Sequence, residues 1–156
     1  MDNPTQVPGD LALQGDCIQA SHFGDVIGLE HLEAPEGSAI IELSIKPHLC
    51  NRYGTIHGGV IMSLIDAAGL WAGVPKAGLP SRTATVSLNC DFMRAAHFDS
   101  ARTLRASADV IKRGRSLYFS SIIVRANRDG PIIASGQGVY AISSKSDKDG
   151  ESLIAT

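Results

Sequence analysis

The chain has 156 residues, the length of one domain, because two domains of this total would each have too small a core to fold. It carries 14 Lys and Arg against 16 Asp and Glu, a net charge of -2, which argues against a nucleic-acid-binding protein. With 44% hydrophobic and 19% charged residues, the composition also excludes a disordered chain. We expect one soluble domain over residues 21–143, between an N-terminal arm (1–20) and a C-terminal tail (144–156).

Cysteine usage and the N-terminus indicate a cytoplasmic protein. None of Cys17, Cys50 and Cys90 belongs to a Cys-x-x-Cys pair, which favours free thiols in a reducing compartment. The first residues show no basic stretch followed by an apolar one, so no secretory signal is predicted. The apolar run 58–74 is short for a membrane span and carries Asp66 at its centre, which favours a helix buried in protein.

The elements follow in order from the spacing of apolar residues. Ser21 is a suitable N-cap and predicts a short helix over 21–28. Alternation with period two predicts a strand from Ala39 to Ile45, which Pro47 ends, and the run 58–74 predicts a long helix. Four more strands are predicted at 83–92, 104–110, 117–126 and 132–142, the last two joined by a hairpin turn at 127–130.

The strand at 83–92 shows the clearest alternation. One face is predicted to carry apolar side chains and the other polar ones: Ala84, Val86, Leu88, Cys90 and Phe92 against Thr83, Thr85, Ser87, Asn89 and Asp91. Strands around one helix predict an α+β fold, an antiparallel sheet wrapped around a long central helix. Because this helix is apolar nearly all round, a sheet on one flank leaves apolar surface for a second subunit, so we expect a dimer.

The candidate chemistry lies on the long helix. Asp66 is the one carboxylate in the run, and a charge there is costly unless it is hydrogen-bonded, paired or functional. A structural Asp and a general base or nucleophile are both consistent with this spacing. Gly58 and Gly59 start the helix, where free backbone N–H groups suit an oxyanion, although Gly-Gly is also an ordinary turn. Eight residues of helix separate Gly58 from Asp66 by roughly 12 Å, so a joint site would be shared between two subunits.

The sequence His57-Gly58-Gly59, followed by Asp66, resembles that of hotdog-fold thioesterases of the phenylacetate-degradation (PaaI-like) group. The similarity extends over residues 40–142 and includes Asn51, the segment 92–96 and the turn 112–116. It departs from the usual pattern at Ala95, where such proteins often have Pro.

The resemblance implies roles for particular residues. Asp66 would attack the thioester carbonyl or activate a water, and the Gly58 N–H would bind the thioester oxygen. Asn51 would position the thioester or water, and Thr85 would orient the carboxylate or the water. His57 would either touch the thioester or only fix the turn, and both readings stay open. Binding of coenzyme A (CoA) would fall to Gly59, Phe92, Met93, Arg94, Lys112, Arg113, Gly114, Arg115 and Ser116.

Alternatives accompany each of these assignments. Charges at 112–116 are also typical of a solvated hairpin tip, and Tyr53, Met62 and Trp71 fit either an acyl pocket or plain core. The function implied is hydrolysis of an acyl- or aryl-CoA thioester, with no metal and no cofactor beyond the CoA of the substrate. A homodimer is expected, and the resemblance implies a tetramer, with no nucleic-acid or membrane partner. The rivals are a non-catalytic acyl-CoA sensor, a hotdog dehydratase or hydratase, and a structural dimer module.

Overall fold

The computed structural model describes residues 23–32, 34–75 and 82–143. The predicted arm, the tail and Ser21 lie outside the described residues, so the domain boundaries stay predictions. The elements in chain order are α1 (Phe23–Ile27), β1 (Leu29–Leu32), β2 (Ser38–Ser44), the 3-10 turn η1 (Pro47–Leu49), α2 (Gly58–Ala72), β3 (Arg82–Phe92), β4 (Thr103–Arg113), β5 (Leu117–Ala126) and β6 (Ile132–Ser143).

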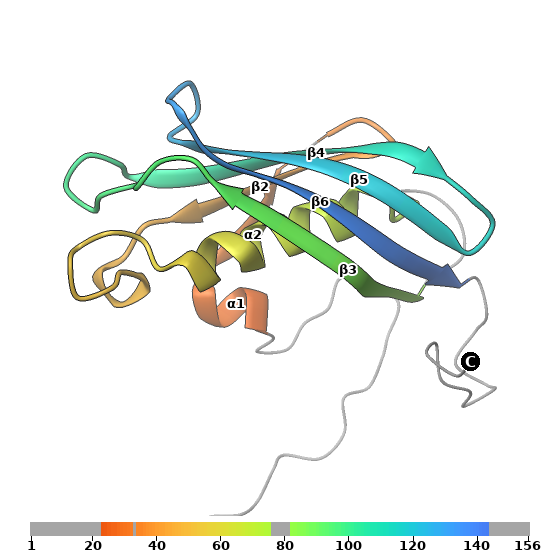
Figure 1. Ribbon diagram of the computed structural model, residues 1–156, viewed down its shortest axis with the longest axis horizontal. Coiled ribbons are helices and arrows are strands. Elements are labelled where there is room, and N and C mark those ends of the chain that lie inside the picture. The colour runs from red at the N-terminus through yellow and green to blue at the C-terminus, as the bar shows by residue number, and fades with distance from the viewer. Residues whose placement is uncertain (1–22, 33, 76–81, 144–156) are drawn as a thin grey trace, which may run out of the picture.

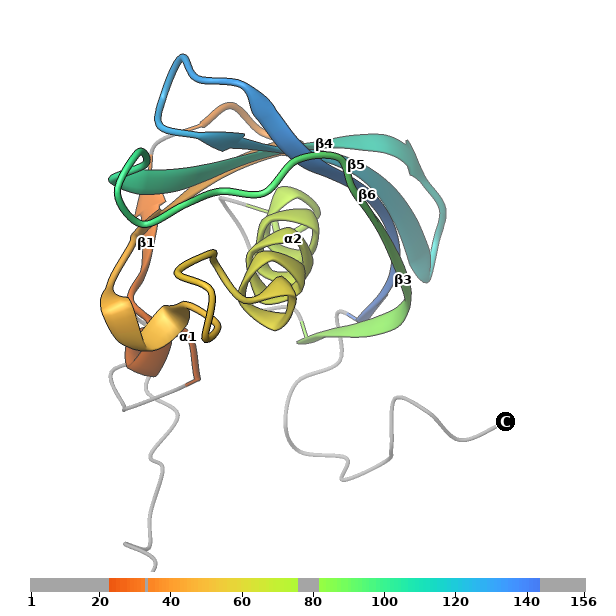
Figure 2. The ribbon, with the colours of Figure 1, turned by 60° about the vertical axis from the view of Figure 1, so that its left-hand side comes forward.

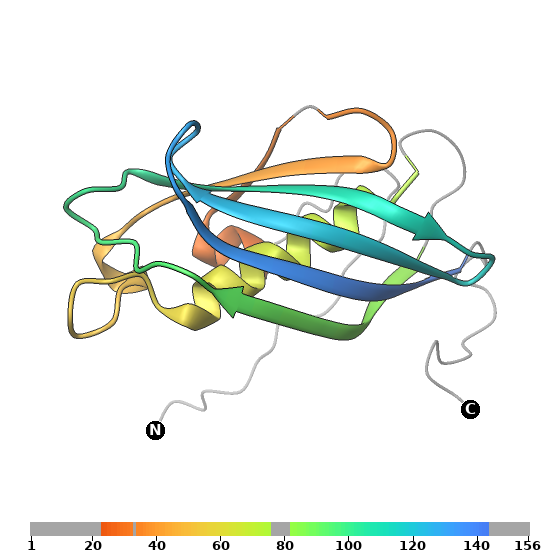
Figure 3. The ribbon, with the colours of Figure 1, turned by 45° about the horizontal axis from the view of Figure 1, so that its top comes forward.

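The strands form one sheet in the order β1-β2-β4-β5-β6-β3, and every neighbouring pair is antiparallel (Figures 1 and 3). The sheet curves, and α2 lies along its concave face (Figure 2). The predicted α+β fold, a sheet wrapped around a central helix, is confirmed.

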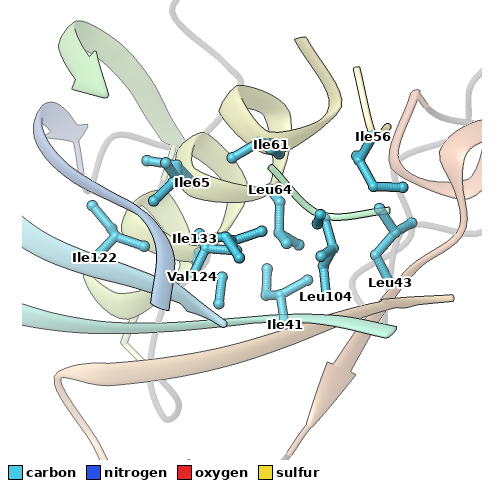
Figure 4. Close-up of a cluster of buried hydrophobic side chains, with 14 of the residues drawn as sticks. Ile41, Leu43, Ile56, Ile61, Leu64, Ile65, Leu104, Ile122, Val124 and Ile133 are labelled. Atoms are coloured by element: carbon cyan, nitrogen blue, oxygen red, sulfur yellow. The ribbon is translucent and has the colours of Figure 1, made fainter. Parts of the chain in front are cut away.

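The core lies between α2 and the concave face of the sheet (Figure 4). Alternate residues of β2, β4 and β5 point inward and meet the apolar face of the helix, as the period-two pattern predicted. Fully buried members of this core are Ile41, Leu43, Leu64, Ile65, Leu104, Ile122, Val124 and Ile133. Each such side chain contributes about 1.5–3 kcal/mol through its removal from water.

The C-terminal end of α2 approaches the sheet closely because Gly69 in the helix and Gly73 at its C-cap lack side chains. A Cβ added at Gly73 would overlap the ring of Tyr118, and one at Gly69 would overlap the hydroxyl of Tyr140. Three hydrogen bonds from the sheet also reach the last carbonyls of the helix: from Tyr118 to Leu70 (2.6 Å), from Ser120 to Gly69 (2.9 Å) and from Arg113 to Gly73. This end of α2 is therefore fixed on the sheet.

The sequence prediction missed one strand, β1. Its four residues, Leu-Glu-His-Leu, are mostly exposed and pair only with β2, at the edge of the sheet. An edge strand with little buried surface gives no apolar alternation to detect. The other five strands and α2 lie where the sequence predicted them, with ends that differ by up to three residues.

The predicted faces of β3 are wrong over part of its length. A β-bulge interrupts the pairing with β6 between Thr85 and Ser87, so Val86 opposes no residue and is 59% exposed. The extra residue reverses the alternation, which turns Thr85 to the same side as Leu88. Thr85 therefore faces α2, whereas strict alternation placed it on the opposite side. Phe92, predicted with the apolar face, is 53% exposed at the end of the strand.

Candidate active site

Asp66 lies in the middle of α2 and is held by a side chain from β3. Its Oδ1 accepts a hydrogen bond of 2.7 Å from the Thr85 hydroxyl. The bulge after Thr85 makes this contact possible, since without it the hydroxyl would point away from the helix. Asp66 is half-buried, and Oδ2 receives no hydrogen bond from the described residues. The carboxylate is thus oriented on one side and open on the other.

The N-terminus of α2 leaves one backbone donor unused. His57 is the N-cap, in extended conformation, and its Nδ1 accepts from the Gly59 N–H at 3.0 Å. The N–H groups of Val60 and Ile61 bond to the His57 carbonyl. Within the described part of the chain, the Gly58 N–H donates to no acceptor. The geometry shows the turn-fixing role of His57, and it leaves Gly58 as the free donor at the positive end of the helix dipole.

Phe92 lies beside this free donor. A Cβ built on Gly58 would come within 3.4 Å of the Phe92 ring, so the exposed end of β3 borders the start of α2. Met93 and Arg94 follow Phe92 and are also exposed. Their backbone N–H groups both bond to the Ile133 carbonyl, which holds the segment against β6. These residues of the predicted CoA set therefore gather at the N-terminal end of the helix.

Asn51 organises its own loop. Its Oδ1 accepts from the N–H groups of Tyr53 (2.9 Å) and Thr55 (3.3 Å), and its Nδ2 donates to the Thr55 hydroxyl at 2.6 Å. Gly54, with φ of 73°, completes the turn in the left-handed region that glycine tolerates. These bonds use Oδ1 as acceptor and one of the two N–H groups of Nδ2. A contact of Asn51 with substrate, as predicted, would therefore use the second Nδ2 N–H.

The turn at 112–116 does not gather its cations into one groove. A second bulge, between Val110 and Lys112, places Arg113 opposite the buried Tyr118. The Arg113 guanidinium lies over the Tyr118 ring, 5.2 Å from its centroid, and donates to the Gly73 carbonyl. Lys112 lies on the opposite face of the sheet, where it lines an open hollow of about 550 Å³ with Ile111, Phe119 and Gln137. Arg113 is thus occupied at the end of the helix.

Each chain separates the two ends of the predicted site. Gly58 and Phe92 lie at the N-terminal end of α2, and the 112–116 turn lies at its C-terminal end, where Arg113 meets Gly73. The helix of 15 residues is roughly 22 Å long, with Asp66 near its middle. Gly58 and Asp66 are therefore separated by roughly 12 Å along one helix, and the basic turn lies beyond Asp66 at the other end.

Two buried tyrosines pack against α2 in the turns that follow Asp66, and sequence reasoning did not single them out. Tyr118 and Tyr140 are fully buried and stack with ring centroids 5.2 Å apart. Burial, and then the charge of Asp66, raise the pKa of the Tyr140 hydroxyl well above its ordinary value. For Tyr118, burial raises the pKa, and Arg113 partly opposes the shift. The sequence signal that could have identified them is a hydroxyl-bearing side chain at a position of β5 and of β6 that the alternation turns toward the helix.

Other features of the chain bear on possible cofactors and location. Among the described residues, no three His, Cys, Asp or Glu side chains could together hold a metal ion. Cys50 and Cys90 are free thiols, and Cys17 lies outside the described residues. No helix in 23–32, 34–75 or 82–143 is both long and apolar enough for a membrane span.

Comparison with known proteins agrees with this architecture. The family model of the thioesterase superfamily matches residues 53–133, just over half of the chain. Human acyl-coenzyme A thioesterase 13 is 28% identical over 121 residues, which are 76% of this chain and 84% of that protein. Zebrafish thioesterase superfamily member 2 is 28% identical with a TM-score of 0.65, covering 79% of this chain and 88% of that one. The E. coli PaaI protein of the phenylacetic acid degradation operon is 22% identical with a TM-score of 0.64, covering 76% and 81%, and shares the fold.

The antiparallel sheet, the helix on its concave face and these similarities define a hotdog-fold thioesterase. The chain belongs to the thioesterase superfamily, and it is a thioester hydrolase. The resemblance predicted from the sequence is therefore confirmed. The roles of individual residues stay predictions.

Proposed function

We propose that the protein hydrolyses an acyl- or aryl-CoA thioester to the free acid and CoA, with Asp66 and Gly58 as the central groups. The observation that carries the proposal is the arrangement of α2. Thr85 orients Asp66 through Oδ1, and neither Oδ2 nor the Gly58 N–H has a hydrogen-bond partner among the described residues. The similarity to an acyl-coenzyme A thioesterase supports CoA as the leaving group. No metal and no cofactor beyond the CoA of the substrate enter the proposed reaction.

The proposed chemistry uses the two groups on opposite sides of the thioester carbonyl. The Gly58 N–H and the helix dipole stabilise the negative charge that develops on the carbonyl oxygen. Asp66 either adds to the carbonyl carbon, forming an anhydride that water then cleaves, or removes a proton from an attacking water. In both routes the carbon–sulfur bond breaks, and CoA leaves as the thiol. Both routes fit the same geometry.

We further propose that the site forms between two subunits of a homodimer, or of the tetramer that the resemblance implies. Gly58 and Asp66 are too far apart along one helix to act on one carbonyl, since the reacting atoms must lie within about 3 Å of their partners. Antiparallel helices across a two-fold axis would bring Gly58 of one subunit to Asp66 of the other. Met62 lies one turn before Asp66 on the same side of α2 and is 39% exposed, so it supplies apolar surface for such a contact.

The function is tested by CoA release from a panel of phenylacetyl-, hydroxybenzoyl-, short-, medium- and long-chain acyl-CoA thioesters. We expect turnover by the wild type, and a loss of several orders of magnitude in Asp66→Asn with fold and oligomer unchanged. The exposed Asp129→Asn in the turn between β5 and β6 is the matched control, because it makes the same change of charge at a residue outside the candidate site. Binding without release by the wild type would favour the sensor, and full activity in Asp66→Asn would remove Asp66 from the mechanism.

The shared site is tested by mixing subunits. Gly58→Pro deletes the N–H that we propose as oxyanion donor, and proline suits the first position of a helix after an extended residue such as His57. Gly58→Ala keeps the N–H and is the control. A heterodimer of Gly58→Pro and Asp66→Asn subunits contains one site with both groups intact, so mixing two inactive proteins should restore activity. No restoration in a verified heterodimer would rule out the shared site.

A further inference from the structure

The hydroxyl of Tyr140 is a buried polar group with no structural task of its own. Tyr140 is fully buried, and its hydroxyl has no hydrogen-bond partner within residues 23–32, 34–75 and 82–143. Its neighbour in the ring stack, Tyr118, donates to the Leu70 carbonyl. A buried hydroxyl without a partner destabilises the fold, and phenylalanine would fill the same space without that cost.

The fold reserves space for this hydroxyl at the position of two glycines. A Cβ at Gly69 of α2, or at Gly138 of β6, would overlap the Tyr140 hydroxyl. Gly69 comes three residues after Asp66, so the hydroxyl lies against the turn of the helix that begins at the carboxylate. The cross-strand partner of Tyr140 is Thr85, the residue that already bonds to Asp66.

The surroundings of the hydroxyl keep it protonated, so that it can act as a donor toward the Asp66 carboxylate. Burial and the Asp66 carboxylate both raise the Tyr140 pKa, so the phenol keeps its proton at neutral pH. The titratable and charged groups that face Asp66 from the sheet are Tyr140 of β6 and Tyr118 of β5, with Arg113 of β4 against Tyr118. Since the Tyr118 hydroxyl already donates to the helix, Tyr140 is the donor left for the carboxylate.

We propose that Tyr140 is a positioning residue for the thioesterase reaction proposed above, with the unpartnered O–H dipole of its hydroxyl directed at the Asp66 carboxylate. Thr85 donates a hydrogen bond from β3, and the Tyr140 dipole acts on the same carboxylate from β6. Together they fix the rotamer of Asp66 and leave its remaining lone pairs for the substrate. The inference rests on the proposed function, and it adds a residue from the interior of the sheet.

The test compares Tyr140→Phe with Tyr118→Phe, since each removes one hydroxyl from the same ring stack. For Tyr140→Phe we expect kcat to fall roughly tenfold with KM unchanged and Tm equal to the wild type or higher. For Tyr118→Phe we expect a lower Tm and kcat near that of the wild type. Unchanged kcat in Tyr140→Phe, or losses of kcat and Tm that match those of Tyr118→Phe, would overturn the proposal.

A second readout separates this inference from the proposed function. The carboxyl carbon of Asp66 is followed by ¹³C NMR and assigned by its loss in Asp66→Asn. We expect its resonance to move in Tyr140→Phe and to stay in place in Tyr118→Phe. A resonance that does not move overturns the interaction of Tyr140 with Asp66 even if the wild type hydrolyses thioesters. A resonance that moves in a protein that releases no CoA keeps the interaction and removes the proposed function.

Discussion

The C-terminal end of α2 is bound to the sheet by side chains, whereas its N-terminal end is capped by His57 alone. At the C-terminal end, Tyr118, Ser120 and Arg113 bond to three of the last carbonyls. At the N-terminal end, the cap takes the Gly59 N–H and leaves that of Gly58 without an acceptor in the described residues. The first N–H groups of a helix have no partner within the helix, so the Gly58 N–H is available to solvent or to a ligand.

The two ends of the helix therefore have different properties, and we call the C-terminal end the closed end and the N-terminal end the open end. At the closed end, close packing at Gly69 and Gly73 and three hydrogen bonds fix the distance of α2 from the sheet. Arg113 also places a positive charge at the negative end of the helix dipole. The open end keeps a donor for a ligand. Asp66 lies between them, where the rigid half determines its position.

The largest expected effect is a loss of stability when packing at the closed end is disrupted. Gly73→Ala introduces a methyl group that overlaps the buried Tyr118 ring, and we expect it to lower the free energy of unfolding by about 3 kcal/mol or more. Gly58→Ala is the matched change at the open end. There the methyl group meets the exposed Phe92 ring at 3.4 Å, an ordinary contact, so we expect a change within about 0.5 kcal/mol. Urea denaturation of both variants measures the difference, and equal losses would contradict the asymmetry.

A smaller effect separates the two arginines of the 112–116 turn. Arg113→Ala removes a bond to the Gly73 carbonyl and a cation–π contact, so we expect it to cost about 1–3 kcal/mol of stability. Arg115 is exposed with no side-chain partner in the described residues, and we propose that it is the free cation for CoA phosphates. Arg115→Ala should therefore raise KM several-fold with Tm unchanged, because remote phosphate contacts bind ground and transition states alike.

The measurements for this pair are thermal unfolding and steady-state kinetics on the same preparations. A rise in KM for Arg113→Ala without a loss of Tm would return Arg113 to the CoA groove, as the sequence predicted. An unchanged KM for Arg115→Ala would assign that side chain to solvent.

Much of the fold could be predicted from the sequence because its signals are local. Alternating apolar residues revealed five strands, and the apolar run from Gly58 revealed α2. The edge strand β1 escaped because it buries too little. The bulge at Val86 escaped because an extra residue leaves no mark in a period-two pattern, although it decides that Thr85 faces Asp66.

The site was predicted in part, for a similar reason. The sequence singled out Asp66 and Gly58 as candidates because each is unusual within its own segment. Arg113, by contrast, was grouped with Lys112 and Arg115 by proximity in sequence, and a second bulge turns Arg113 instead of Lys112 toward α2. Tyr140 was not found, because its relation to Asp66 arises only when β6 packs against α2.

The smallest expected effect concerns His31, which joins the edge strand β1 to the closed end of α2. Its ring contacts Trp71 edge-on, with centroids 4.5 Å apart, and burial lowers the pKa of His31. In the unfolded chain His31 takes up a proton near pH 6.5, whereas in the fold it does so only at lower pH. Between these values the unfolded state binds more protons, so stability is lost as pH falls below about 6.5.

His31→Phe keeps an aromatic ring beside Trp71 and removes the titration. Between pH 7.5 and 5.5 we expect the Tm of the wild type to fall further than that of the variant, by roughly 1–2 °C, because His31 is still partly exposed. The difference between the two curves isolates His31 from every other group that titrates in this range. Parallel curves would mean that the imidazole is equally solvated in the folded and the unfolded chain. The contact between His31 and Trp71 would then contribute no pH-dependent stability.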